Sequence, residues 1–197
     1  FILCNSKFME IQIFKLKNLR WLIMYNNNFS GPLPATFEYN PILYYVHFYN
    51  NNFSGPVPAY ESNSLGYLYL HRNQLTQLNT LNCPNLLRLF VSYNQLSGAI
   101  PDLSPLVRMY DCFLNNNQLS DYTIGSFVGI TRIRRLDISA NLLTETSINN
   151  IMNDLYLNYE SAPRSNVTIN ITGNAAPSGD AVEQMEFLRS KGWSIRT

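Results

Sequence analysis

Cysteine and charged residues are both scarce in this chain of 197 residues. Only three cysteines occur, Cys4, Cys83 and Cys112, which excludes a full set of disulfides, and no Cys-x-x-Cys or Cys/His spacing indicates a metal site. Charged residues make up 14% of the chain and the formal net charge is +1. This composition argues against a disordered chain and against nucleic acid as the partner. The sequence therefore predicts one modest domain that is stabilised by packing alone.

Long apolar runs and catalytic motifs are also missing. No run reaches the roughly 18 residues of a membrane-spanning helix, so no membrane insertion is expected. The chain begins with Phe1 and lacks the layout of a signal peptide, so we expect an upstream domain or further repeats of the same chain. The two histidines, His47 and His71, have no carboxylate or thiol at catalytic spacing. We therefore expect no enzyme activity, no catalytic residue, no cofactor and no metal.

Asparagine and leucine are abundant instead, at 26 residues each. Residues 25–34 recur almost letter for letter as residues 49–58, a shift of 24. Alignment on the pattern Leu-x-x-Leu-x-Leu-x-x-Asn-x-Leu places its ninth position at Asn27, Asn51, Asn73, Asn94, Asn117 and Asn141. Six consecutive units therefore share one period of 21 to 24 residues.

The spacing within each unit predicts a stacked coil. Every first, fourth, sixth and eleventh position is apolar, apart from the thiol of Cys112. Positions four and six face one side of an extended strand, and positions three, five and seven face the other side. One coil cannot bury its apolar side alone, so neighbouring coils are expected to stack in parallel around a continuous core. The ninth-position Asn is expected to bridge backbone groups of adjacent coils and to tolerate the tight bend after the strand.

These units resemble the leucine-rich repeat family over at least residues 18–143. The Ser-Gly endings at Ser30, Ser54 and Ser97 are similar to the plant-type variant, in which a second short extended segment follows the Asn. Later units with Thr76-Gln77 and Ser120-Asp121 depart from it. The resemblance implies an α/β solenoid: a right-handed leucine-rich repeat superhelix with a parallel concave β-sheet, an irregular convex side and a helical C-terminal cap. Residues 1–143 are then repeats, of which the first is partial.

The rhythm breaks after residue 143, and residues 144–197 are expected to hold the last repeat and the cap. The next ninth-position match is Asn174, 33 residues after Asn141. Apolar residues at helical spacing over residues 148–159 predict an amphipathic helix on the convex side. This insertion accounts for the long interval.

A second helix is expected from residue 180 to about residue 191. Asp180 is expected to cap it, Gly192 to end it, and Trp193 and Ile195 to alternate as in a short closing strand. The run from Asn174 to Gly192-Trp193 is similar to the C-terminal ends of some bacterial leucine-rich repeat proteins, where Asn-x-x-Pro-Ser-Gly leads into a helix and then Gly-Trp. The resemblance again implies a cap.

The outward positions three, five and seven are unusually aromatic. Solvent-facing strand residues with only a structural role are mostly Thr, Lys, Glu or Ser, so large rings in adjacent rows indicate a binding surface. Charge enters late, at Arg88, Asp111, Arg135 and Asp137, so binding is expected to concentrate on units one to five. The predicted ligand-binding residues are Trp21, Tyr25, Tyr45, His47, Tyr49, Tyr67, Tyr69, His71, Arg88, Phe90 and Phe113.

Three functional interpretations follow from this face. The favoured one is a non-enzymatic recognition module for a protein or peptide, as the C-terminal part of a cell-surface, secreted or virion protein. A protein is favoured over a glycan because adjacent strands place the rings too close together for each ring to hold its own sugar. A glycan-binding adhesin and a purely structural spacer are the alternatives, since stacked rings alone stabilise a sheet by about 0.2 to 1 kcal/mol per pair.

Overall fold

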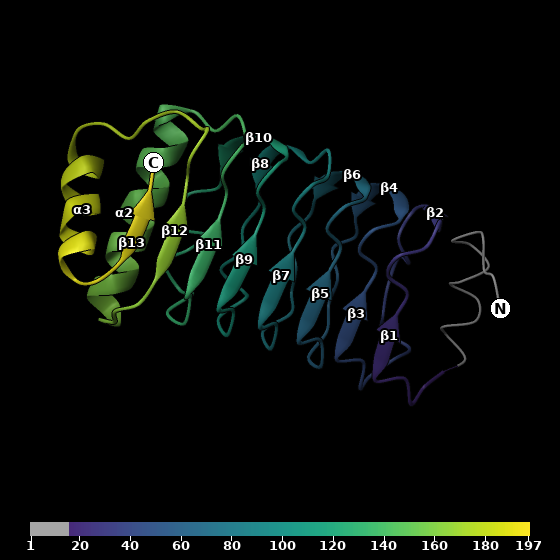
Figure 1. The fold of residues 1–197 in the computed structure, drawn as a ribbon. Coiled ribbons are helices and arrows are strands. Elements are labelled where there is room, and N and C mark those ends of the chain that lie inside the picture. The colour runs from purple at the N-terminus through teal and green to yellow at the C-terminus, as the bar shows by residue number, and fades with distance from the viewer. Residues whose placement is uncertain (1–15) are drawn as a thin grey trace.

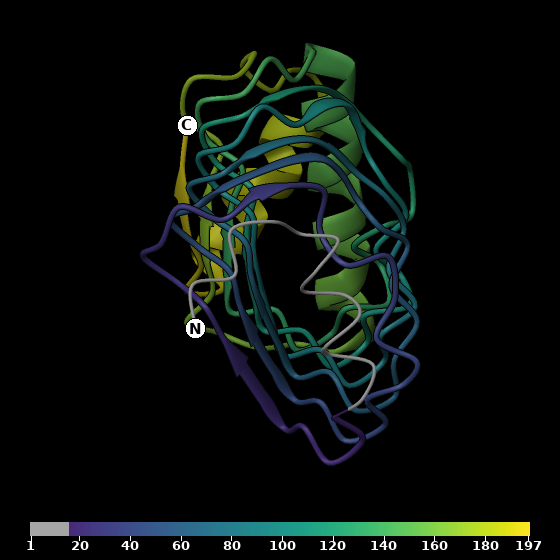
Figure 2. The ribbon, with the colours of Figure 1, turned by 90° about the vertical axis from the view of Figure 1, so that its right-hand side faces the viewer.

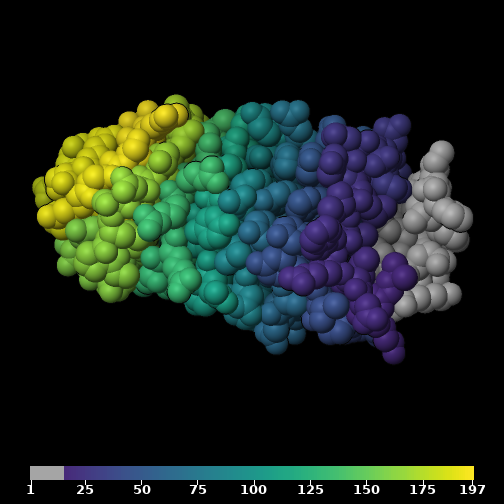
Figure 3. All heavy atoms as spheres, turned by 60° about the horizontal axis from the view of Figure 1, so that its bottom comes forward, coloured from purple at the N-terminus to yellow at the C-terminus, as the bar shows by residue number. Residues whose placement is uncertain are grey.

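The chain folds into a solenoid whose eight short parallel strands form one continuous sheet (Figure 1). The computed structural model describes residues 16–197. The sheet order follows the chain, with the strands β1 (Trp21–Ile23), β3 (Tyr45–His47), β5 (Tyr67–Tyr69), β7 (Arg88–Phe90), β9 (Asp111–Phe113), β11 (Arg135–Asp137), β12 (Thr168–Asn170) and β13 (Ser194–Arg196). Successive coils form bands across the molecule (Figure 3). The stacked fold expected from the repeats is confirmed.

Each strand directs its middle residue into the core, and its outer two residues are exposed or half-buried, except for the buried Asp111 of β9. In β5, Leu68 is fully buried, whereas Tyr67 and Tyr69 are half-buried. The same alternation holds in β3 and β7, and residues at equal repeat positions pair directly, as Tyr45 does with Tyr67. The expected assignment of inward and outward positions therefore holds in these strands, and Asp111 of β9 is an exception because it is buried. In the first unit, the core-facing side chains of Leu19, Met24 and Phe29 are only partly buried.

The ninth-position asparagines form a ladder that joins consecutive coils. The side-chain Nδ2 of Asn73 donates to the carbonyl of Phe48 in the preceding coil at 3.0 Å and to Leu70 at 2.9 Å. Its Oδ1 accepts from the backbone N–H of Phe53 at 3.0 Å. The equivalent bridges occur at Asn51, Asn94, Asn117, Asn141 and Asn174. These amides satisfy backbone groups that lack regular sheet partners.

The tight bend lies one residue earlier than expected. The residue with positive φ is the eighth of each unit, with values of 50° to 57° at Asn26, Asn50, Arg72, Tyr93, Asn116 and Ala140. The expectation that the ninth Asn tolerates this bend is therefore wrong. The left-handed region costs an L-residue roughly 1–2 kcal/mol, and the hydrogen bonds of the following Asn hold the eighth residue there.

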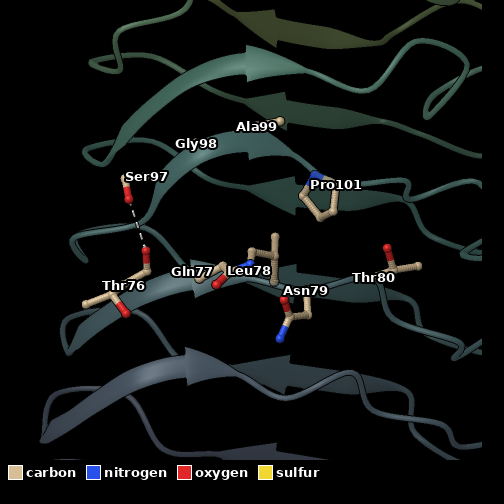
Figure 4. Close-up of a pocket in the computed structure, with 9 residues that line it drawn as sticks. All are labelled: Thr76, Gln77, Leu78, Asn79, Thr80, Ser97, Gly98, Ala99 and Pro101. Atoms are coloured by element: carbon tan, nitrogen blue, oxygen red, sulfur yellow. Dashed lines mark hydrogen bonds between the residues drawn. The ribbon is translucent and has the colours of Figure 1, made fainter.

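A second extended segment follows the Asn in every complete repeat from the first to the fifth. β2 (Ser30–Gly31), β4 (Asn52–Val57) and β6 (Gln74–Leu78) form one small parallel sheet, and β8 (Ser97–Ile100) and β10 (Gln118–Tyr122) form another. β6 and β10 show that the segment persists where the Ser-Gly ending is lost. Between β6 and β8 lies an open groove of about 620 Å³, which the hydrogen bond from Ser97 Oγ to the Thr76 carbonyl at 3.4 Å spans (Figure 4).

The C-terminal cap contains two helices, as expected. α2 (Glu145–Ser161) lies across the coil from the sheet (Figure 2) and buries its apolar side, including Ile151 and Leu155. Thr144 caps α2, since its hydroxyl oxygen accepts from the backbone N–H of Ser147 at 3.2 Å. These contacts close the convex side around the core.

The second helix starts differently from the prediction. α3 (Asp180–Ser190) has Gly179 as its N-cap and no side-chain cap hydrogen bond, so the expected capping role of Asp180 is wrong. Asp180 lies in the first turn, where its negative charge interacts favourably with the positive end of the helix dipole. Gly192 follows with φ of 85°, and the buried side chains of Trp193 and Ile195 lead into β13 as expected. The expectations that concern Cys4 and the partial repeat before residue 16 lie outside the described residues.

Candidate ligand-binding surface

The concave face, which comprises the outward side chains of the eight-stranded sheet, carries three rows of rings. In the row at position five, His47, Tyr69, Phe90 and Phe113 stack in sequence, with centroids 4.4, 4.6 and 4.5 Å apart and planes within 8° to 12°. The strand spacing dictates this distance, because residues at equal positions in neighbouring strands lie about 4.8 Å apart. The result is one continuous stack across four strands.

The two flanking rows are shorter. At position seven, Tyr25, Tyr49 and His71 stack at 4.6 and 4.4 Å with planes within 9°. At position three, Tyr45 and Tyr67 stack at 4.6 Å. Trp21 meets Tyr45 edge to face at 5.7 Å and 87°. The structure thus brings the predicted aromatic residues together in one patch.

Because the rings stack on one another, the concave face presents ring edges rather than ring faces. Only the rings at the ends of a row have an open face, and Trp21 is the most open, with 60% of its surface exposed. Tyr25 is also exposed, whereas Tyr45, Tyr69 and Phe90 are half-buried. The patch is therefore a rigid apolar surface edged with phenol hydroxyl groups.

The pKa values of the two histidines of the face are lowered. Burial lowers the pKa of His47, and burial together with the Arg72 charge lowers the pKa of His71 to about 4. Nε2 of His47 and Nδ1 of His71 are buried and have no hydrogen-bond partner within the described part of the chain. No group of His, Cys, Asp and Glu within residues 16–197 could hold a metal ion. The histidines thus serve as rings in the stacks.

Next to the rings lies a charged corner formed by Arg88, Asp111 and Arg135. Nε and Nη2 of Arg135 donate to the two carboxylate oxygens of Asp111 at 2.7 and 2.6 Å. Nε of Arg88 lies 3.0 Å from Oδ2 of the same carboxylate, and its Nη1 donates to the Tyr69 hydroxyl at 3.3 Å. Asp111 was expected to face solvent at position three, but the two arginines cover it and leave only 1% exposed.

Two further tyrosines border this surface and were not predicted. Tyr44 packs edge-on against both Tyr45 and Tyr67, and Tyr110 lies under Arg88, whose Cζ is 5.1 Å from the ring centroid. Both occupy position two, which precedes the strand and lies outside the alternation used for prediction. Gly66, at the same position of the next unit, makes room for Tyr44, since a Cβ there would lie 2.3 Å from its ring. Position two carries Arg20, Tyr44, Gly66, Leu87, Tyr110 and Arg134 in the six units, so no pattern at this position could have identified them.

The two cysteines within residues 16–197 are packing residues. Cys83 and Cys112 are both buried and unpaired. Burial raises the pKa of the Cys83 thiol to about 11 and raises the pKa of Cys112 as well. Low thiolate content and lack of access both oppose a nucleophilic role.

Comparison with known proteins supports both the repeat in the sequence and the solenoid fold of the structure. The Leucine Rich Repeat family model matches residues 18–40. A leucine-rich repeat protein of Leptospira interrogans superposes with a TM-score of 0.58 at 21% identity, over 94% of this chain and 50% of that protein. The chain therefore has the leucine-rich repeat fold, and its residues 18–40 match the repeat itself. No curated protein sequence matches it.

Two other structures match with TM-scores below 0.5. An internalin of Listeria monocytogenes matches at 18% identity and a TM-score of 0.49, over 94% of this chain and 63% of that chain. A plant peptide hormone receptor, solved in complex with RGF2, matches at 20% identity and a TM-score of 0.48, over 93% and 36% of the two chains. The chain thus spans about half the length of the Leptospira protein and less than two thirds of the others. None of the helices described here is both long and apolar enough to cross a membrane.

Proposed function

We propose that this leucine-rich repeat chain is a non-enzymatic recognition module that binds a protein or peptide on its concave face. The observation that carries the proposal is the continuous aromatic patch over β1 to β9, in which three rows of stacked rings face solvent. Rigid rings give much contact area for little loss of rotamer entropy, and truncation of such an anchor often costs about 2 kcal/mol or more of binding free energy. The module then belongs to a longer secreted, cell-surface or virion-surface protein.

Sheet stabilisation alone is a weaker explanation for the patch. Stacking can account for the half-buried rings, since each cross-strand pair contributes about 0.2 to 1 kcal/mol. It does not require rings this large at the outward positions of three adjacent rows, since Thr or Val would also suit a strand. Contiguous exposed apolar surface is costly in water and usually marks an interaction site.

The ring geometry favours a protein ligand over a glycan. A sugar stacks on an open ring face, but at centroid distances of 4.4 to 4.6 Å each ring inside a row covers its neighbour. Side chains of a protein ligand can instead pack against ring edges and reach the phenol hydroxyl groups. A glycan-binding adhesin would have to rely on Trp21 and the other terminal rings.

A random linear peptide library displayed on phage tests the proposal. Peptides are selected on the folded chain, and their affinity is then measured for a variant carrying Tyr45→Ala, Tyr69→Ala and Phe90→Ala. A second variant carries Thr at these positions, since Thr keeps the strand propensity if the alanine variant fails to fold. The matched control carries Ile124→Ala, Leu142→Ala and Leu157→Ala, which truncate exposed apolar side chains away from the concave face.

We expect the affinity of the selected peptides for the ring variants to fall at least about tenfold, which is on the order of the loss for one anchor residue. Their affinity for the control variant should not change. Folding is checked by circular dichroism and thermal unfolding. Peptides that bind all variants equally well would contradict the proposal. A glycan array run in parallel gives the adhesin alternative its own direct readout.

A further inference from the structure

The charged corner holds more positive than negative charge. Arg88 and Arg135 both contact the single carboxylate of Asp111, through distances of 3.0 and 2.6 Å to the same oxygen, Oδ2. The one negative charge of Asp111 therefore neutralises only one of the two positive charges. The whole chain has a net charge of only +1, so this corner is a local excess of positive charge on a nearly neutral protein.

Each arginine also retains unused donors that face solvent. Arg135 donates through Nε and Nη2 to Asp111, and Arg88 donates through Nη1 to the Tyr69 hydroxyl, while Nε of Arg88 lies 3.0 Å from Oδ2 of Asp111 without forming a hydrogen bond. Nη1 of Arg135 and Nη2 of Arg88 form no hydrogen bond to other residues of the described chain. The side chains of Arg88 and Arg135 are 34% and 51% exposed. An incoming group can thus reach both of them.

The surrounding rings fix the two guanidinium groups in place. Cζ of Arg88 lies 5.6 Å from the ring of Tyr67 and 5.1 Å from that of Tyr110, and Cζ of Arg135 lies 5.4 Å from the ring of Phe113. Cations held over aromatic faces lose little further freedom on binding, and the apolar walls strengthen their electrostatic interactions. Asp111 is thus a positioning residue: it orients Arg88 and Arg135, but it leaves Nη2 of Arg88 and Nη1 of Arg135 without a hydrogen-bond partner among the described residues.

We infer that the charged corner binds a carboxylate of the ligand, an Asp or Glu side chain next to an apolar segment that lies along His47, Tyr69, Phe90 and Phe113. This inference rests on the proposed function. Arginine suits planar carboxylates because its donors match the two oxygens, and a carboxylate between Nη2 of Arg88 and Nη1 of Arg135 would balance the local charge. Both arginines approach the same oxygen of Asp111, at 3.0 and 2.6 Å, which places the two guanidinium groups next to each other at this corner.

The peptides selected on the chain test this inference. For a peptide whose binding depends on the rings, each acidic residue is replaced by its amide, Asp by Asn or Glu by Gln. The dissociation constant is measured by fluorescence polarisation for the wild-type chain and for Arg135→Gln, which leaves Asp111 paired with Arg88. Arg132→Gln, an exposed arginine outside the strand positions, is the matched control.

We expect one amide replacement and Arg135→Gln each to weaken binding about tenfold, and the two together to weaken it little further, because both remove the same contact. Affinity should also fall with added salt for the acidic peptide and much less for its amide form. Ring-dependent peptides that lack acidic residues, or whose amide forms bind as tightly, would overturn this inference and leave the proposed function standing. If no selected peptide depends on the rings, both are contradicted.

Discussion

Asn73 and Phe48 lie in neighbouring coils, and the side-chain amide of Asn73 donates to the Phe48 carbonyl at 3.0 Å. The same side chain accepts from the backbone N–H of Phe53 at 3.0 Å, so one residue satisfies two backbone groups of the preceding coil in a buried site. Replacement of this Asn leaves those groups without partners, which costs about 1–3 kcal/mol for each buried group. The ladder therefore contributes directly to the stability of the fold.

Asn73→Ala is expected to lower the free energy of unfolding by about 2 to 4 kcal/mol. Asn27→Ala is the matched control, because Asn27 occupies the same repeat position but is exposed, and it should cost less than about 1 kcal/mol. Urea titration followed by circular dichroism measures both. Equal losses for the two variants would mean that the ladder does not act through buried hydrogen bonds.

The close approach of Tyr44 to Gly66 gives a second prediction. Gly66→Ala places a methyl group 2.3 Å from the present position of the Tyr44 ring, so the ring must move, and we expect a destabilisation of about 1 to 3 kcal/mol. In a Tyr44→Ala background, the same substitution should cost much less. A double-mutant cycle in thermal unfolding measures the coupling. Additive effects would show that the ring does not occupy this position.

The histidine in the position-seven row makes stability depend on pH. The pKa of His71 in the folded chain is about 4, lowered by burial first and then by Arg72, against an ordinary value of 6.5. The unfolded chain therefore binds more protons between these values, and this contribution to stability falls as the pH drops from above 6.5 toward 4. His71→Phe keeps a ring in the stack and removes the titration.

We expect the wild-type chain to lose more stability between pH 7.5 and pH 4.5 than His71→Phe does. Acidic side chains titrate in both proteins, so the difference between them isolates the histidine. Urea titrations at the two pH values provide the measurement, and proton NMR of the imidazole gives its pKa directly. An imidazole that titrates near 6.5 would show that the ring is not desolvated in the stack.

A buried carboxylate anchors the loop after β10 to α2. Asp154 accepts from the Tyr122 hydroxyl at 2.5 Å and from the backbone N–H of Gly125 at 2.7 Å. Asp154→Ala is expected to destabilise the chain by about 2 to 4 kcal/mol, because buried donors lose their acceptor. Tyr122→Phe, which leaves the carboxylate and its bond to Gly125, should cost less. Hydrogen exchange should rise first at Gly125 and Phe127, and a uniform rise over all coils would argue against a local anchor.

The periodic part of the structure could be predicted from the sequence because each unit repeats the same local geometry. The buried position of Leu68 and the bridging role of Asn73 follow from spacing alone. The helix expected over residues 148–159 from the change of period is present as α2, which extends further at both ends to Glu145–Ser161.

The remaining features depend on contacts between different positions of different coils. Asp111 was placed toward solvent by alternation, but two arginines from the coils on either side cover it. Tyr44 and Tyr110 precede their strands, where alternation says nothing about direction. The left-handed conformation of Tyr93, with φ of 54°, could not be predicted from its residue type, because Tyr has no special preference for positive φ.

The most direct test of the account is a crystal structure of the chain bound to one of the selected peptides. We expect the peptide to lie across β3 to β9, with apolar side chains against Tyr69 and Phe90. A peptide bound along the second strands β4 to β10 or on the α2–α3 cap, with the rings of the concave face still in contact with solvent, would contradict it.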